Sequence, residues 1–159
     1  MAIRSVTAAD QPRIHAILVA TEAFTPAEVE CADELVAEAV EQPDKGDYFV
    51  FVLEDEGAVQ GYVCYGDTPL TEGTHDLYWI AVDPARHGRK YGQRLVAFVE
   101  AQLRARGGRL LLIETSSKES YGATQAFYLR CGYVELARIP GFYRPGDDKI
   151  VYGKYLSVG

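Results

Sequence analysis

A basic turn between a strand and a helix is the part of this chain best suited to chemistry. The apolar run 77–82 ends before a proline, and Arg86, Arg89 and Lys90 then surround glycines that open an amphipathic helix. The first backbone N–H groups of a helix have no partner within the helix, and its dipole adds partial positive charge there. Such an arrangement binds phosphate. The stretch therefore predicts a phosphate-bearing ligand. The alternative is an exposed basic turn that binds nothing.

Charge is distributed unevenly along the sequence, whose net charge is −7. Twelve acidic residues and one lysine lie between positions 22 and 56, whereas seven cations and one glutamate lie between positions 86 and 109. Such runs have two explanations. They are solvated helix faces, or the protein binds a cationic ligand at one place and an anionic ligand at another. Because the whole chain is acidic and its basic segment is short, we expect no nucleic-acid partner.

Length and composition exclude several classes of protein. A chain of 159 residues fits one domain, residues 1–159, with 48% hydrophobic and 25% charged residues. Its three scattered cysteines argue against a disulfide framework or a zinc site, so we expect no metal. No apolar run reaches the roughly 18 residues that span a bilayer, and the apolar part of residues 1–6 is shorter than we expect of a signal peptide. We therefore expect a cytoplasmic protein without a membrane partner, either a monomer or a homodimer.

Hydrophobic periodicity predicts the elements that position the basic turn. The expected strands cover residues 3–6, 48–53, 59–65, 77–82, 110–113, 133–139 and 149–156. The expected helices cover residues 7–18, 26–42, 91–103 and 121–130, and the loop 141–148 joins the last two strands. The order β-α-α-β-β-β-α-β-α-β-β predicts an α/β fold with a mixed sheet covered by helices.

Two motifs on this framework resemble those of the GNAT acetyltransferase superfamily. The family signature is Gln or Arg, two residues, Gly, one residue, then Gly or Ala. In this sequence the three specified positions fall on His87, Lys90 and Gly92. His87 and Lys90 therefore depart from the signature. Residues 126–133, Ala-Phe-Tyr-Leu-Arg-Cys-Gly-Tyr, resemble the family's Phe-Tyr-x-x-x-Gly-Phe. The resemblance covers nearly the whole chain and implies the GNAT fold and transfer of an acetyl group from acetyl-CoA to a primary amine.

The resemblance also implies where acetyl-CoA binds. Its pyrophosphate would lie on the N–H groups of the basic turn, and its pantetheine arm would pair with the backbone of the strand before it. Lys90 brings a Cβ to a position of close approach and adds a positive charge. The residues assigned to the cofactor are Ile80, Ala81, Val82, His87, Gly88, Arg89, Lys90, Tyr91, Gly92, Gln93 and, with a looser match, Ser117.

Acetyl transfer to an amine needs an acid for the departing thiolate, and the resemblance implies Tyr128. This residue leaves its helix about 100° from Phe127, so Phe127 can pack while Tyr128 faces the cleft. A phenol with a pKa of about 10 stays protonated at neutral pH and can donate. The alternative is a packed tyrosine, one of the 11 in the chain.

The attacking amine must also lose a proton, and Glu114 at the end of the strand 110–113 is the candidate base. A glutamate at this position resembles the base in the branch of the family that modifies protein N-termini. Partial burial with a raised pKa would suit that role. A carboxylate that caps backbone or pairs with an arginine is an equal alternative, and Asp76 and His75 (the latter expected at the surface) are further candidates.

In the family the loop before the last strand forms a wall of the acceptor site. The resemblance therefore implies that Tyr143, together with Glu114, binds the substrate. The alternative is a Pro-Gly-Asp turn with incidental aromatic residues. The acidic segment predicts a cationic acceptor, a small amine or a peptide amino group, that attacks directly in a ternary complex without a cysteine nucleophile. Two other classes remain open, a non-catalytic acyl-CoA sensor and a nucleic-acid-associated module.

Overall fold

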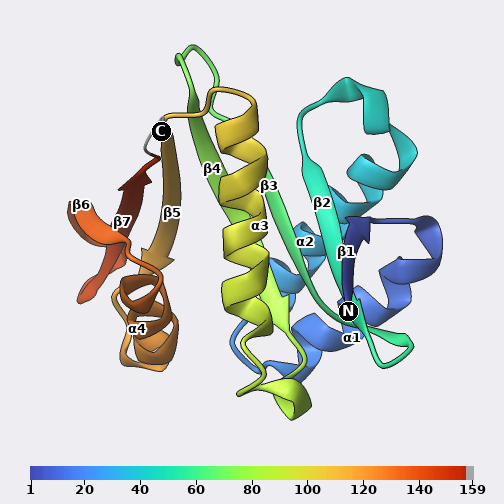
Figure 1. The fold of residues 1–159 in the computed structure, drawn as a ribbon. Helices are drawn as coiled ribbons and strands as arrows, with labels where there is room; N and C mark the ends of the chain where they lie inside the picture. Colours follow the sequence, from blue (N-terminus) through green and yellow to red (C-terminus); the bar gives the residue numbers. More distant parts are fainter. Residues whose placement is uncertain (157–159) are drawn as a thin grey trace. The chain divides into compact units, whose positions relative to one another are not determined.

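The computed structural model describes residues 1–156, which form seven strands and four α-helices (Figure 1). The strands are β1 (Ala2–Ser5), β2 (Phe49–Asp55), β3 (Ala58–Asp67), β4 (Thr74–Val82), β5 (Leu110–Ser116), β6 (Val134–Arg144) and β7 (Asp147–Tyr155). The α-helices are α1 (Gln11–Ala20), α2 (Pro26–Glu41), α3 (Tyr91–Ala105) and α4 (Gly122–Arg130). Short 3-10 helices are η1 (Ala8–Asp10), η2 (Pro43–Lys45), η3 (Pro84–Arg86) and η4 (Glu119–Tyr121). The predicted order of strands and α-helices is confirmed.

The described strands make one mixed sheet in the order β1-β2-β3-β4-β5-β7-β6. β4 and β5 are parallel, with Leu77 opposite Ile113, whereas the pairs β1–β2, β2–β3, β5–β7 and β6–β7 are antiparallel. Parallel neighbours need a long crossover, which α3 supplies. The chain divides into two compact units, residues 1–67 with 78–99 and residues 68–77 with the chain from 100 onward, and each is described by itself.

In the first unit, β2 is apolar on both faces because both faces are covered. Val50 and Val52 belong to a buried cluster that contains residues of α1 and α2. Phe51 points the other way, and its ring centroid lies 4.8 Å from that of Phe98 in α3. Side chains alternate along a strand, so the nearly continuous apolar run predicted at residues 48–53 reflects two packed faces rather than one.

Helix α2 begins where its sequence predicts. The Glu28 amide donates to Thr25 Oγ1 at 3.2 Å, and the Thr25 amide donates to Glu28 Oε1 at 3.0 Å. This reciprocal capping box satisfies two N–H groups that the helix leaves without partners, and Pro26 at the first helical position needs none. The predicted start of the helix at residue 26 is therefore confirmed.

In the second unit, β5 and β7 turn buried side chains toward α4. Leu111, Ile113 and Ile150 are each no more than 2% exposed. Glu100 of the same unit has a buried carboxylate, which accepts a hydrogen bond from the Tyr133 hydroxyl at 2.8 Å and lies 3.1 Å from the Lys154 ammonium. A buried charge needs such partners, so this cluster stabilises the unit without providing a free reactive group.

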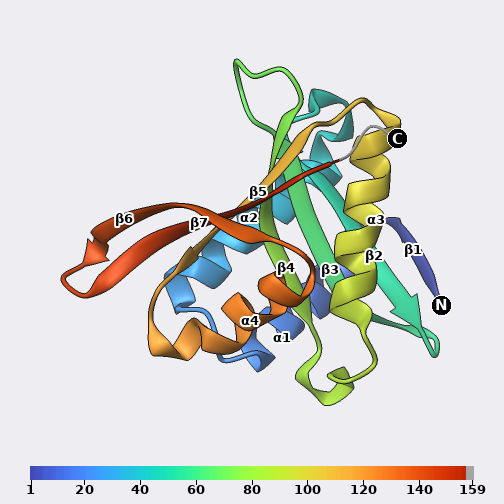
Figure 2. The same ribbon diagram turned by 60° about the vertical axis from the view of Figure 1, so that its left-hand side comes forward.

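Strands β6 and β7 form a long hairpin in the second unit, drawn in orange and red in Figure 2. The prediction of a loop over residues 141–148 is wrong, because β6 continues to Arg144 and β7 begins at Asp147. The irregular pairing between Ile139 and Arg144 and the left-handed backbone of Gly141 (φ +62°) allow the strand to continue past Pro140. The turn itself is only Pro145–Gly146.

Other features of residues 1–156 concern chemistry that the sequence argues against. Cys31, Cys64 and Cys131 are free thiols. Within these residues no group of three or more His, Cys, Asp or Glu side chains is placed to hold a metal ion. None of the helices in this part of the chain has the length and apolar character needed to cross a membrane.

Candidate functional site

The basic turn, residues 84–93, connects β4 to α3 in the first unit. Gly88 and Lys90 have left-handed backbones with φ of +89° and +62°. Helical bonding starts where the Arg94 amide donates to the Lys90 carbonyl at 3.1 Å. The amides of Tyr91, Gly92 and Gln93 precede that first bond, so the helix offers them no acceptor. The turn thus has the backbone arrangement that binds anions.

Lys90 departs from the expected glycine at a position where the backbone favours glycine. A non-glycine residue in the left-handed region costs about 1 kcal/mol. Its side chain is exposed, and within residues 1–156 it forms no ion pair. The lysine therefore adds an uncompensated positive charge to the turn, at some cost in free energy of folding.

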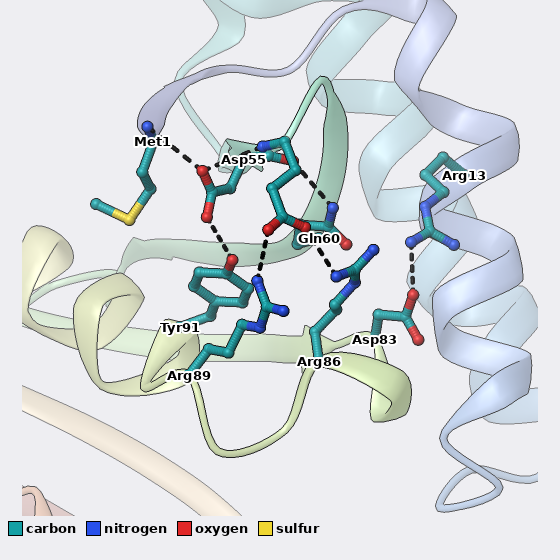
Figure 3. A network of polar contacts seen from close by, with 9 residues as sticks. Met1, Arg13, Asp55, Gln60, Asp83, Arg86, Arg89 and Tyr91 are labelled. Atoms are coloured by element: carbon teal, nitrogen blue, oxygen red, sulfur yellow. Dashed lines mark hydrogen bonds and ion pairs between the residues drawn. The ribbon is translucent and has the colours of Figure 1, made fainter.

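A carboxylate from the β2–β3 turn joins the two arginines of the basic turn. Arg86 Nη1 lies 2.8 Å from Glu56 Oε2, and Arg89 Nη1 lies 2.8 Å from Glu56 Oε1. Figure 3 shows both guanidinium groups reaching toward the β2–β3 turn. Pairing with Arg89 first, and with Arg86 second, lowers the pKa of Glu56, so its carboxylate is ionised at neutral pH.

The residue before Glu56 holds the first turn of α3. The Tyr91 hydroxyl donates to Asp55 Oδ2, and the buried Gln60 side chain donates from Nε2 to the Asp55 carbonyl at 2.9 Å (Figure 3). The hydrogen bond from Tyr91 is the main cause that lowers the pKa of Asp55. Together these contacts fix the β2–β3 turn against the basic turn within the first unit.

A third ion pair fixes the start of the basic turn. Arg13 of α1 donates from Nη2 to Asp83 Oδ2 at 2.7 Å (Figure 3). It also donates from Nε to the Val59 carbonyl at 2.9 Å. Asp83 also accepts from the Ala85 amide, which caps η3. The Arg13 hydrogen bond is the first cause that lowers the pKa of Asp83.

The last residues of β4 lie beside β3 in the same unit. Ala81 is 5% exposed, while Ile80 and Val82 are partly buried. A Cβ at Gly61 of β3 would lie 2.9 Å from the Ala81 carbonyl oxygen. Glycine at this position therefore allows β3 and β4 to approach closely just before the basic turn.

Tyr128 lies in α4 of the second unit and is 4% exposed. Its ring is surrounded by those of Phe127, Tyr133 and Tyr152, with centroids 5.4 to 6.3 Å away. The pKa of its hydroxyl is raised well above the ordinary value, mainly by burial and to a smaller extent by nearby Cys131. Among residues 1–156 this hydroxyl has no hydrogen-bond partner. The ring is therefore buried, while the hydroxyl is protonated and has no partner among the described residues.

Glu114 is the second predicted catalytic residue, and its environment differs from the expected one. Its side chain is 53% exposed rather than partly buried, and Oε2 lies 3.2 Å from Lys149 Nζ. The same ammonium lies 4.6 Å from the centroid of the Phe142 ring. Among the predicted alternatives, pairing with a cation is the one that the structure contains, with lysine in place of arginine.

The end of β5 is fastened to the start of β7. Ser117 Oγ accepts from the Asp148 amide at 2.7 Å, and the Ser117 amide donates to the Asp148 carbonyl at 2.9 Å. Ser116 Oγ donates to the buried carboxylate of Asp147. Ser117 thus has a defined structural partner, and its hydroxyl proton remains available for a further bond.

The remaining predicted residues are also in the second unit. Tyr143 is 45% exposed, and its ring makes an edge-to-face contact with that of Phe142. Asp76 accepts a hydrogen bond from the Thr68 hydroxyl at 2.6 Å. The expectation of a surface His75 is wrong, because it is 6% exposed and a Cβ at Gly108 would lie 3.0 Å from its Nε2.

A family model for the acetyltransferase (GNAT) domain matches residues 46–135. This span is more than half of the chain and contains both the basic turn and Tyr128. The chain belongs to the GNAT acetyltransferase family. The family resemblance predicted from the two motifs is thereby confirmed, together with the mixed α/β fold.

Solved structures resemble this GNAT acetyltransferase over nearly its full length. A GNAT-family protein from Desulfovibrio desulfuricans is 40% identical, with a TM-score of 0.94 over 98% of this chain and 99% of that one. An aminoglycoside 6'-N-acetyltransferase complexed with coenzyme A has a TM-score of 0.76 at 17% identity, covering 99% and 98% of the two chains. A Salmonella typhimurium protein with acetyl-CoA bound has a TM-score of 0.74 at 20% identity, covering 99% and 94%. No curated protein was found to match the sequence.

Sequence reasoning missed the carboxylates that the GNAT acetyltransferase places beside its basic turn. Asp55 and Glu56 belong to the acidic segment 22–56 and lie between the predicted strands 48–53 and 59–65. Their partners are about 30 residues or more away along the chain. The charge asymmetry between the two segments is the one signal in the sequence that could have suggested the pairing.

Proposed function

We propose that this chain transfers an acetyl group from acetyl-CoA to a primary amine by direct attack in a ternary complex. One observation carries the proposal: in a member of the GNAT family, three cations surround a left-handed turn that precedes the open N-terminus of α3. Relatives of the same fold are described with coenzyme A or acetyl-CoA bound. We also propose that residues 1–159 act as one domain and work in the cytoplasm, where acetyl-CoA is available.

In this proposal the basic turn holds the pyrophosphate of acetyl-CoA. The amides of Gly88 to Gln93 donate to its oxygens, the cations at positions 89 and 90 add attraction, and His87 donates a further hydrogen bond. The backbone of residues 80–82 pairs with the pantetheine arm, and Ser117 donates its remaining hydroxyl proton to the cofactor. Acetyl-CoA supplies the activated acyl group, and the protein supplies its orientation.

The reaction requires one new bond, one broken bond and two proton movements. The amine nitrogen attacks the thioester carbonyl carbon, the C–N bond forms, and the C–S bond breaks. Tyr128 gives its hydroxyl proton to the departing thiolate, a role supported by its place in the motif 126–133 and by a hydroxyl without a hydrogen-bond partner among residues 1–156. The excess proton of the amine passes to the Glu114 carboxylate, directly or through water.

The acceptor in this proposal is cationic and meets Glu114 and Tyr143. Glu30, Glu34 and Glu41 on α2 are exposed and suit a cationic molecule. Glu38 and Glu54 of the same segment instead have partners within the chain, Lys45 and Arg4. We assign the attraction for the acceptor to the three exposed acids of α2, and replacing all three with glutamine should raise the acceptor KM.

A panel of amines with acetyl-CoA, followed through release of the free CoA thiol, tests the function. A thermal-unfolding series with CoA precedes it, because a ligand that binds the folded state raises the unfolding temperature as its concentration rises. Absence of any shift at millimolar CoA would contradict the donor assignment. A shift without turnover of any amine would favour the non-catalytic acyl-CoA sensor instead.

A further inference from the structure

The β2–β3 turn brings an anion to the place where the proposed donor's phosphates need cations. Glu56 has a left-handed backbone (φ +53°) and is followed by Gly57 at φ +78°. Its side chain is 49% exposed, so the carboxylate is held at the surface rather than sequestered. No motif of the sequence drew attention to this residue.

The position of that carboxylate is fixed by contacts that do not involve it. Gln60 is 2% exposed and donates from Nε2 to the Asp55 carbonyl at 2.9 Å, while the Tyr91 hydroxyl donates to the Asp55 side chain. Figure 3 shows Asp55 between these two partners. Because Asp55 is tied both to β3 and to α3, the next residue is directed at the basic turn by the fold.

Glu56 binds the arginines in the way that a phosphate would. One oxygen pairs with Arg89 and the other with Arg86, both at 2.8 Å. Carboxylate and phosphate present paired oxygens to guanidinium groups with the same kind of geometry. Within residues 1–156, Glu56 supplies the only carboxylate that forms an ion pair with either arginine.

We propose that Glu56 is an internal competitor that sets the affinity of the basic turn for the phosphates of the donor. The proposal rests on the proposed function, since the competing phosphate belongs to acetyl-CoA. When the donor binds, Arg86 and Arg89 exchange the carboxylate for phosphate oxygens. When CoA leaves, the carboxylate returns to both arginines, which shortens the lifetime of the product complex.

The test compares Glu56→Gln with the matched control Glu54→Gln. Glu54 lies two positions away, is 40% exposed and pairs with Arg4 of β1 at 3.1 Å, so its replacement removes the same charge without touching the basic turn. Binding of CoA and of inorganic pyrophosphate is measured by calorimetry at low salt. Glu56→Gln removes two exposed ion pairs of about 0.5 kcal/mol each, which the bound ligand no longer has to replace. This loss corresponds to about fivefold tighter binding of both ligands by the variant. Glu54→Gln should match the wild type.

Three further readouts keep the proposal falsifiable. The gain of Glu56→Gln should shrink at 0.5 M salt because screening weakens exposed charges. The inhibition constant of the product CoA should fall about fivefold in Glu56→Gln. The kcat of this variant should stay the same or fall. Glu56→Asp, whose shorter carboxylate keeps the charge but reaches only one arginine, should give an intermediate affinity.

The outcomes separate this proposal from the function on which it rests. Weaker binding of both ligands by Glu56→Gln would show that the carboxylate positions the arginines, and equal binding would show that it does nothing; either result overturns the competitor role. If the wild type binds pyrophosphate but not CoA, the donor assignment fails. Tighter pyrophosphate binding by Glu56→Gln alone would then still support the exchange of anions.

Discussion

The basic turn in the first unit and the residues around Tyr128 in the second handle protons and charge in opposite ways. The turn is exposed and charged, and each of its arginines is paired with a carboxylate. Tyr128 is buried among aromatic rings, where desolvation keeps its hydroxyl neutral. Exposed charges are weakened by water and salt, whereas a buried donor keeps its full hydrogen-bonding strength. Binding of an anionic donor suits the first environment, and a neutral hydroxyl that donates a hydrogen bond suits the second.

The two regions also share one property, a charged side chain that pairs with the group proposed to meet a ligand. Glu56 occupies the arginines of the basic turn, and Lys149 occupies the carboxylate of Glu114. Each group has the sign of charge that the corresponding ligand of the proposed reaction would bring. In both regions, ligand binding would therefore include an exchange of ion-pair partners, and at the basic turn Lys90 adds a charge that has no such partner within residues 1–156.

The largest effect is expected from Tyr128→Phe. Loss of the general acid should lower kcat by about 10²-fold or more, whereas the dissociation constant of CoA should stay the same. Tyr133→Phe is the matched control, because it removes another buried hydroxyl of the same unit. That hydroxyl donates to Glu100, so its loss should lower the free energy of unfolding by about 1 kcal/mol and leave kcat intact. Equal turnover by Tyr128→Phe and the wild type would exclude Tyr128 as the acid.

A smaller effect is expected at the basic turn. Arg86→Gln and Arg89→Gln each remove a cation of the turn and should weaken CoA binding about tenfold, with little change in kcat. Arg104→Gln, near the end of α3, removes the same charge in an exposed position and serves as control. A fall in kcat equal to that of Tyr128→Phe would contradict the division between binding and proton transfer.

Lys149→Met tests the ion pair that occupies Glu114 at the proposed acceptor site. Removal of the ammonium frees Glu114 for the acceptor amine, and the acceptor KM should fall about threefold, as expected for loss of one exposed competing pair. Glu114→Gln should instead lower kcat by at least tenfold. Steady-state kinetics with varied acceptor distinguish the two. A rise in KM with Lys149→Met would mean that the lysine helps to bind the acceptor.

The smallest effect concerns the backbone of the basic turn. Lys90→Gly removes a non-glycine residue from the left-handed region and should raise the free energy of unfolding by about 0.5 kcal/mol, after the greater entropy of glycine in the unfolded chain is deducted. Gly88→Ala, at φ +89°, should lower it by about 1 kcal/mol. Thermal unfolding measures both, and a loss of stability in Lys90→Gly would show that the lysine side chain stabilises the turn.

The fold was largely predictable because its elements are encoded locally. The capping pair Thr25 and Glu28 and the alternating apolar residues of the strands act over a few positions, so sequence alone located the helices and strands. The hairpin β6–β7 was missed as a continuous pair because Pro140 and Gly141 normally end a strand. Its continuation depends on β7, which accommodates the irregular pairing there.

The sequence by itself determined the family, the order of the elements and the place of the basic turn, since each depends on residues that are close together along the chain. Tertiary structure alone decided that Glu56 pairs with Arg86 and Arg89, that Lys149 pairs with Glu114, and that His75 is buried. Charge partners and burial depend on which segments fold together, and elements distant in the sequence meet only when the sheet has formed.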